Sequence, residues 1–322
     1  MSVTTVDAQV TRGEPAEGWW SRYRLPLLFL LPSLVVTVCF FVAPVVITLI
    51  ISMTDMSVST GLSGFSWIGL EHYRSIADSP WVPVILKNTF LYVAGTLIFF
   101  NVGLGLVIAV ATAFIPKPQG SVFRALWLLP RITPSVVYVI MMKWAAADAP
   151  YGILNQWLAP LGVEPQNWMY AQPWLFIIAL NGFVGASMGM ILFSSAIQSI
   201  PSTHFLAAEV DGASNWQIIR RIVLPQLKWP ILFTTVYQTL SLLTSFEYIM
   251  LTTNGGPGFY TTEVWSLYAY HTALSNYYGN AQYGLGAALT AILVVIGIIM
   301  SVVYFKFFRF KELVARPKIE IN

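Results

Sequence analysis

Residues 198–229 read QSIPSTHFLAAEVDGASNWQIIRRIVLPQLKW and stand between two long apolar runs of the chain. Ser214, with Gln217 three residues later, has the form of a capping box and predicts that a short helix begins there. Gly212 supplies a turn just before this helix because glycine tolerates positive φ, and Pro225 is expected to end the helix. The stretch therefore predicts a folded helical element, which we call the helical knob.

A first short helix is predicted upstream of that turn, from Ser202 to Val210. The hydroxyl of Ser202 is expected to accept a hydrogen bond from a free amide at the start of this helix. We expect the helix to present Phe205, Ala207 and Ala208, because small side chains allow close insertion into the groove of a partner. From this pattern alone, an amphipathic element that merely joins two apolar runs is an equally good interpretation.

The composition of the chain places it in a membrane. Of its 322 residues, 57% are hydrophobic and 10% are charged, and the mean hydropathy is +0.68, which is typical of integral membrane proteins. A bilayer core of about 30 Å requires roughly 20 apolar residues per helix, and we predict an all-α protein with six such spans. The predicted spans are Leu25–Ile51, Val84–Ala113, Phe123–Trp144, Trp174–Ile197, Ile231–Thr252 and Leu285–Phe308.

Basic residues fall mainly on one side of these spans, which marks the cytoplasmic side. The thirteen on that side, of seventeen in all, are Arg12, Arg22, Arg24, Lys117, Arg124, Arg220, Arg221, Lys228, Lys306, Arg309, Lys311, Arg316 and Lys318. Both termini and the helical knob are therefore predicted to be cytoplasmic, with tails at residues 1–24 and 309–322 around a membrane domain at residues 25–308. Because this topology explains the net charge of +3, no nucleic-acid partner is expected.

Several residues of the helical knob resemble a known motif. Ala207-Ala208, Asp211-Gly212-Ala213 and Leu224-Pro225 stand at the spacing of the EAA loop of ATP-binding-cassette (ABC) importer permeases. The resemblance implies the fold of a type I ABC importer permease, in which this loop docks on an ATPase subunit. The residues that it assigns to coupling are Phe205, Leu206, Ala207, Ala208, Glu209, Asp211, Gly212 and Ala213.

The knob departs from this family pattern at one position, because the leading Glu of the motif falls on Leu206. Glu209 lies three residues further on, on about the same face of a helix. We hypothesise that Glu209 provides the acidic contact to the ATPase. The alternative is that Leu206 docks through apolar contact and Glu209 faces water.

A second resemblance lies before the last predicted span. Asn254-Gly255-Gly256-Pro257, with Thr261-Thr262-Glu263 and Tyr268-Ala269-Tyr270 after it, is similar to an external loop of carbohydrate-importer permeases of the maltose-permease kind. Trp144 and Gly152-Ile153-Leu154-Asn155 fit the same group. The resemblance implies a bacterial inner-membrane complex with a second permease, two ATPase subunits that bind ATP and Mg²⁺, and an extracytoplasmic binding protein that delivers a carbohydrate.

Polar side chains within the fourth and fifth predicted spans are candidates for a substrate pathway, because polar groups are costly in lipid. Asn181 offers two donors and an acceptor near mid-membrane, and Gln238, Ser241 and Ser245 share one helix face. The stripe of Gln238, Ser241 and Ser245 is equally suited to helix packing, and packing is favoured for Gly185, whereas the Asn181 amide is suited to a sugar hydroxyl. The resemblance to sugar permeases favours a pathway made of Asn181, Gly185, Met188, Tyr237, Gln238, Ser241 and Ser245.

Arg131 and Glu247 are charged residues within the third and fifth predicted spans. Arg131 stands between Pro130 and Pro134, where we expect the third span to be distorted, and Glu247 lies late in the fifth span. They are expected either to pair with each other or to reach a membrane interface separately. A structural role is favoured over direct contact with substrate.

Enzymatic activity of this chain is not expected. It has no Gly-x-x-x-x-Gly-Lys-Ser/Thr phosphate loop, and His72, His204 and His271 are far apart in sequence, so no metal site or catalytic triad is predicted. What the two resemblances imply is a permease subunit of an ATP-driven carbohydrate importer. A secondary transporter driven by an ion gradient is the alternative, and the identity of the sugar does not follow from the sequence.

Overall fold

The computed structural model describes residues 19–148, 150–275 and 279–307, with side chains from residue 24 onward. All regular elements in this part of the chain are helices, and the one β-bridge pairs Thr54 with Trp67. The chain divides into two compact units, Met1–Ile50 and Ile51–Asn322. The predicted tails lie outside the described residues, apart from residues 19–24, which begin the first helix.

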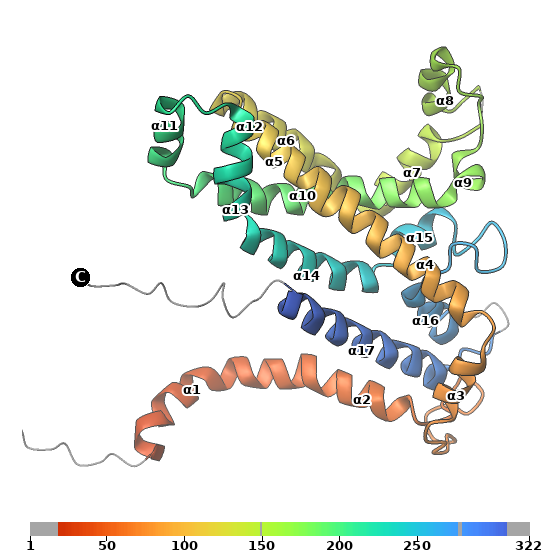
Figure 1. Cartoon of the computed structure of the whole chain (residues 1–322). Helices are drawn as coiled ribbons and strands as arrows, with labels where there is room; N and C mark the ends of the chain where they lie inside the picture. Colours follow the sequence, from red (N-terminus) through yellow and green to blue (C-terminus); the bar gives the residue numbers. More distant parts are fainter. Residues whose placement is uncertain (1–18, 149, 276–278, 308–322) are drawn as a thin grey trace, which may run out of the picture. The chain divides into compact units, whose positions relative to one another are not determined.

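The described part of the first unit, from residue 19 onward, is a long apolar helix (Figure 1). It consists of α1 (Trp19–Thr37), a π-helical segment η1 (Val38–Val42) and α2 (Ala43–Ile51). The part from Arg24 to Ile51 has a mean hydropathy of 3.0 and buries none of its most apolar stretch within the chain. Such a surface is suited to lipid or to another apolar helix.

Two long helices form the centre of the second unit. One is continuous from α4 (Val82–Gly95) through the π-helical η2 (Thr96–Leu104) to α5 (Gly105–Ala113), and the other is α10 (Pro173–Gln198). Gly182, Gly185 and Gly189 of α10 face η2, where a Cβ on any of them would overlap Phe100 or Asn101. The glycines therefore allow the two helices to pack closely.

The third predicted span is sharply broken. It consists of α6 (Lys117–Ile132) and α7 (Ser135–Ala145), whose axes differ by 99°. Thr133 between them is extended, with ψ of 132°, because a residue that precedes proline is disfavoured in helical conformation. The predicted distortion near Pro134 is confirmed.

The fifth predicted span is also interrupted, and the prediction of one continuous helix there is wrong. Helix α14 (Lys228–Thr244) has 17 residues, Ser245 is extended with ψ of 111°, and α15 (Glu247–Thr252) follows. The sixth span is the continuous helix α17 (Tyr283–Phe307). Four continuous helices of the described chain, and the bent pair α6–α7, are thus long and apolar enough to cross a membrane.

Short helices gather at the two ends of the second unit (Figure 1). At one end are those of the helical knob: α11 (Ser202–Val210), α12 (Asn215–Ile218), π-helical η4 (Ile219–Val223) and α13 (Leu224–Gln226). At the other end are α3 (Glu71–Asp78), α8 (Ile153–Leu158), the 3₁₀ turn η3 (Ala159–Leu161), α9 (Trp168–Ala171) and α16 (Trp265–Ala273).

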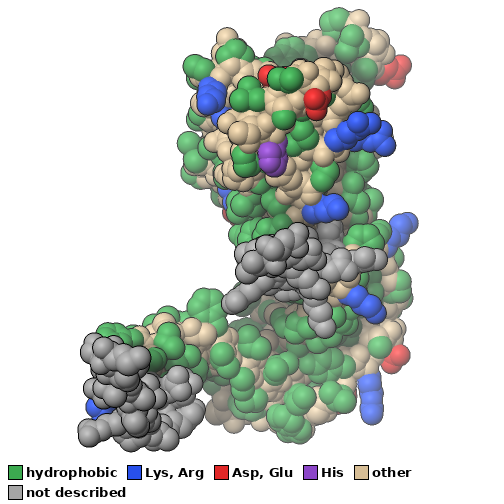
Figure 2. Space-filling view, turned by 60° about the vertical axis from the view of Figure 1, so that its left-hand side comes forward, with side chains coloured by type: hydrophobic (Ala, Val, Ile, Leu, Met, Phe, Trp, Pro, Cys, Tyr) green, Lys and Arg blue, Asp and Glu red, His purple; other side chains and the backbone are tan. Residues whose placement is uncertain are grey.

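Each end of the second unit has its own apolar core. Tyr92, Ile249, Trp265 and Leu289 are buried near α16, and Phe193, Ile218, Val223 and Leu227 are buried under the knob. Elsewhere hydrophobic side chains make up much of the molecular surface (Figure 2). This distribution is expected of helices that face lipid, since a bilayer imposes no penalty on exposed apolar side chains.

Candidate functional site

The helical knob has the two helices and the turn that its sequence predicts. Gly212 has φ of +73° between α11 and α12. Ser214 Oγ accepts from the backbone amide of Gln217 at 3.4 Å, and Gln217 Oε1 accepts from the amide of Ser214 at 2.7 Å. The capping box and the glycine turn are therefore confirmed.

Two details of the knob differ from the prediction. Ser202 is the first residue of α11 and makes no capping hydrogen bond, because Pro201 occupies the cap position. Pro225 does not end the second helix, which continues through η4 and α13 to Gln226. Proline removes one helical hydrogen bond and crowds the preceding turn, and the wider π-helical turn just before Pro225 accommodates it.

The faces of α11 are also distributed differently from the prediction. Phe205 and Ala208 are half-buried. They pack against an apolar core that includes Ile218 and Val223. They hold the knob to the rest of the second unit and are not its outermost side chains. The sequence spacing of three between Phe205 and Ala208 already indicates one shared face.

The exposed surface of the knob combines large apolar side chains with two acidic ones, Glu209 and Asp211. Leu206 and Val210 are 58% and 87% exposed, one helical turn apart, and Trp216 of α12 is 67% exposed. Glu209 is exposed between them, and so are Ala207 and Asp211, whereas Ala213 is half-buried. A face of this kind is suited to a protein partner, because large exposed side chains become buried on docking.

The polar residues predicted to form a substrate pathway divide into two groups. Asn181 and Gln238 are buried and hydrogen-bonded within the chain, Gln238 Nε2 donating to the Gly185 carbonyl at 3.1 Å. In contrast, Tyr237 is 46% exposed and Ser241 is exposed, whereas Met188 and Ser245 are half-buried. Tyr237 and Gln238 are neighbours on α14, so their side chains point in different directions.

A buried tyrosine that the sequence analysis missed joins three elements. Asn181 Nδ2 of α10 donates to the Tyr92 hydroxyl of α4, and this hydroxyl donates to Ser245 Oγ at the break between α14 and α15, at 3.4 Å. Asn88, Tyr92 and Thr96 recur at intervals of four along an apolar run. This polar stripe was the available signal, because such positions share one face of a helix.

Further polar atoms lie unpaired along the same helix interface. Among the described residues, Thr96 Oγ1 and Asn101 Oδ1 are buried without a hydrogen-bond partner, and the Cβ position of Gly185 lies against Asn101. Buried polar groups are nearly always paired. An interface that keeps such groups unpaired is less stable than a fully paired one and has more to gain from rearrangement.

Arg131 and Glu247 do not form an ion pair with each other. Ser135 Oγ at the start of α7 donates to Glu247 Oε1, and the one ion pair among the described residues joins His271 and Glu263. Of the two expectations for Arg131 and Glu247, the direct ion pair is wrong. The break at Pro134 brings Ser135 to the carboxylate instead.

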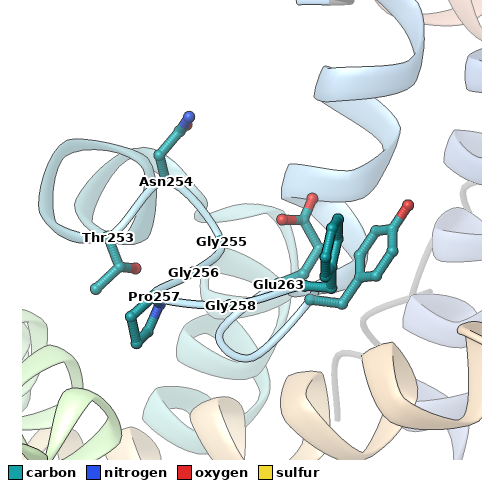
Figure 3. Close-up of a pocket in the computed structure, with 9 residues that line it drawn as sticks. Thr253, Asn254, Gly255, Gly256, Pro257, Gly258 and Glu263 are labelled. Carbon is teal, nitrogen blue, oxygen red and sulfur yellow. The ribbon is translucent and has the colours of Figure 1, made fainter. Parts of the chain in front are cut away.

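The Asn254–Glu263 segment, predicted to be external, forms a hollowed loop between α15 and α16. Its hollow is an open cavity of about 330 Å³ bordered by Thr253–Tyr260 and Glu263 (Figure 3). Glu263 Oε1 lies 2.9 Å from His271 Nδ1, and His271 Nε2 lies 3.1 Å from Asn254 Oδ1. No group of three or more His, Cys, Asp or Glu side chains in the described chain is placed to hold a metal.

Comparison with known families identifies the chain. Residues 101–310 match the family described as the inner-membrane component of binding-protein-dependent transport systems. The chain belongs to this family. It is a membrane-spanning transport subunit, and the ATPase activity of such systems resides in other subunits. Membership also decides against a secondary transporter driven by an ion gradient.

Individual relatives cover nearly the whole chain. The trehalose/maltose transport system permease protein MalF of Thermococcus litoralis is 30% identical over 298 residues, which are 90% of this chain and 95% of the relative. The sulfoquinovosyl glycerol transport system permease protein SmoG of Agrobacterium fabrum is 27% identical over 307 residues, 91% of this chain and 95% of the relative.

The fold has solved counterparts. The crystal structure of a bacterial ABC transporter that imports the acidic polysaccharide alginate contains a chain with a TM-score of 0.75 and 23% identity, covering 90% of this chain and 96% of that chain. A second structure of a bacterial alginate transporter, in complex with a pentasaccharide-bound periplasmic protein, gives a TM-score of 0.77 at 23% identity, covering 91% and 98%. The type I permease fold expected from the sequence is confirmed.

Proposed function

We propose that this chain is one of two permease subunits in an ATP-driven importer of a sugar or sugar derivative. Its partners are a second permease, two ATPase subunits and an extracytoplasmic binding protein. Both termini and the helical knob lie on the cytoplasmic side of the inner membrane. The knob carries the proposal, because it presents a folded, outward-facing apolar surface at the end of the unit opposite to the external loop (Figure 1).

The knob is built to transmit motion. Its core contains Ile218, Val223 and Leu227, packed with Ala109 of α5 and Phe193 of α10. Interiors are close-packed and resist compression, so displacement of the knob by an ATPase moves the two central helices with it. The outer face contacts the ATPase through Leu206 and Val210, with Glu209 beside them.

The sugar pathway follows the interface of α4, α10 and α14. Asn181, Gln238 and Ser245 supply amide and hydroxyl groups there, Tyr92 joins them, and Tyr237 offers an exposed aromatic face. Aromatic faces and amides suit the apolar ring faces and hydroxyls of a sugar. In this conformation Asn181 and Ser245 are hydrogen-bonded to Tyr92, and Gln238 is hydrogen-bonded to the Gly185 carbonyl. Opening of the interface frees these groups for a ligand.

The substrate class rests on the relatives. The named functions of MalF and SmoG concern trehalose or maltose and a sulfoquinovosyl glycerol, and an alpha-glucoside permease of Rhizobium meliloti is 27% identical over 84% of this chain. A neutral or acidic sugar derivative therefore fits best.

Co-expression of the chain with the second permease, ATPase and binding protein of the same system provides the test. The expected result is a complex that retains the ATPase on purification and, in proteoliposomes, takes up a sugar only with ATP and the binding protein. A stable complex whose uptake is driven by an ion gradient without ATP contradicts the proposal.

A further inference from the structure

The external loop between α15 and α16 is held by contacts from several elements. The side-chain amide of Asn88 on α4 donates to the carbonyls of Tyr260 at 2.9 Å, Thr261 at 3.3 Å and Glu263 at 3.1 Å. Thr89 Oγ1, next along α4, accepts from the backbone amide of Trp265 at 2.8 Å. These bonds connect residues more than 170 positions apart and fix the second half of the loop to α4.

The first half of the loop is fixed from within. Thr262 donates its amide to the Gly255 carbonyl at 3.0 Å, and the hydroxyls of Thr253 and Thr262 lie 2.7 Å apart. Gly255 has φ of +87°, and a Cβ there would overlap the Glu263 carboxylate. Asn254 also adopts a positive φ of 50°. A loop with such paired, restricted backbone loses little conformational entropy when it binds a partner.

The tip of this fixed loop is exposed. Pro257 and Gly258 are exposed, and Phe259 is 89% exposed, although the loop is held firmly on either side of them. Figure 3 shows the side chains of Asn254 and Glu263 pointing away from Pro257. The loop therefore presents one large aromatic side chain in a defined place, and an aromatic anchor on a preorganised element is the usual core of a protein interface.

The surroundings of the tip favour a protein partner over lipid. Of the nine residues that border the hollow, Glu263 alone carries a formal charge, and an ionisable group beside the tip is unfavourable in hydrocarbon. The Glu263 carboxylate lies 2.9 Å from the His271 imidazole, so a polar pair stands beside the tip, as is usual at the rim of a protein interface.

We propose that Pro257-Gly258-Phe259 is an anchor for the extracytoplasmic binding protein, with Phe259 in an apolar pocket of that protein. The proposal rests on the proposed function, because it places a binding protein at the end of the unit opposite to the helical knob (Figure 1). The periplasmic protein present in the alginate-transporter complex supports a partner of this kind.

The affinity of the binding protein for the complete transporter in nanodiscs tests the proposal. Phe259→Ala should weaken binding of the sugar-loaded protein by about 10- to 30-fold, as expected for an aromatic anchor. Phe90→Ala is the matched control, since Phe90 is 74% exposed within the apolar α4–α5 span, and its affinity should equal the parental value. Equal affinity for Phe259→Ala and the parent overturns the anchor alone. A parental transporter that binds no sugar-binding protein overturns the proposed function as well.

A spin label separates a protein contact from a lipid contact. Cys39 is the single cysteine of the chain, so Gly258→Cys, exposed beside the intact Phe259, labels the tip alone in a Cys39→Ser background. In the free transporter, a water-soluble relaxation agent should shorten the spin relaxation time of the label. The label should become immobilised when the binding protein is added. If lipid-dissolved oxygen instead relaxes this label as strongly as it relaxes a label at Phe90→Cys, the tip is a membrane anchor and the proposal is overturned.

Discussion

Replacement of Gly212 tests whether the shape of the helical knob couples ATP hydrolysis to transport. Gly212 adopts φ of +73°, and the place where a Cβ would stand is empty to 4 Å. A substitution there therefore acts through backbone conformation and not through a steric clash with a neighbour. A residue other than glycine that is held in the left-handed region destabilises the local fold by about 1–3 kcal/mol. The cost of a β-branched residue lies at the upper end of this range.

A penalty of this size is large relative to the stability of one turn. About 1–3 kcal/mol lowers the population of the native knob roughly 5- to 150-fold relative to alternative conformations. The membrane helices should be unaffected, because the turn is exposed. Gly212→Val should therefore assemble normally but lose most substrate-stimulated ATPase activity and uptake, measured in proteoliposomes at equal protein content.

The matched control is Gly212→Asn, because asparagine adopts left-handed conformation more readily than other residues with a Cβ. It should retain most uptake, and Gly212→Ala should fall between the two variants. Parental uptake by Gly212→Val at normal expression refutes the assignment of the knob to coupling. Equal loss of uptake in the Asn and Val variants refutes the conformational explanation. It would show instead that docking requires the absence of a side chain at position 212.

Three further predictions concern the sugar pathway, the docking face and helix packing. Asn181→Ala and Tyr92→Phe each remove one hydrogen-bonding group, worth about 0.5–1.5 kcal/mol. Each variant should reduce sugar uptake by a graded amount, while ATP hydrolysis without substrate persists. If both variants take up sugar at the parental rate, the pathway lies elsewhere. Glu209→Ala should weaken co-purification of the ATPase, and Leu206→Glu added to that variant should restore part of the loss. If Glu209→Ala has no effect and Leu206→Ala weakens co-purification, docking is apolar. Gly185→Ala should lower the free energy of unfolding by about 1–3 kcal/mol, because the added methyl group overpacks against the facing helix. The thermal transition temperature of the purified complex should therefore fall, and an unchanged temperature contradicts the close packing.

The parts of the fold that the sequence predicts are those with local signals. The capping box of Ser214 and Gln217 and the turn at Gly212 depend on residues within one turn of each other, so the helical knob follows from a few adjacent residues. The break at Pro134 has a local signal too, although its angle of 99° depends on packing. The break at Ser245 has none, because hydropathy averaged over a span does not detect one extended residue.

The candidate site depends on long-range contacts that no local pattern supplies. Tyr92 and Asn181 are 89 positions apart, and their hydrogen bond depends on how closely α4 and α10 approach. The sequence marked Asn181 because it is polar in an apolar run, but it did not show whether the amide meets a ligand or another helix. The same limit explains why Phe205 was expected on the outer face of the knob when it packs inward.

The continuity of α4, η2 and α5 has a mechanical consequence. Its 32 residues, at 1.5 Å each, make a rod of about 48 Å that carries Asn88 at the loop end and Ala109 at the knob end. A push on either end therefore travels along covalent backbone without crossing from one helix to another. The π-helical segment η2 in the middle belongs to a rare helix type that is frequent at functional sites, and we expect such a rod to flex there while both halves stay stiff.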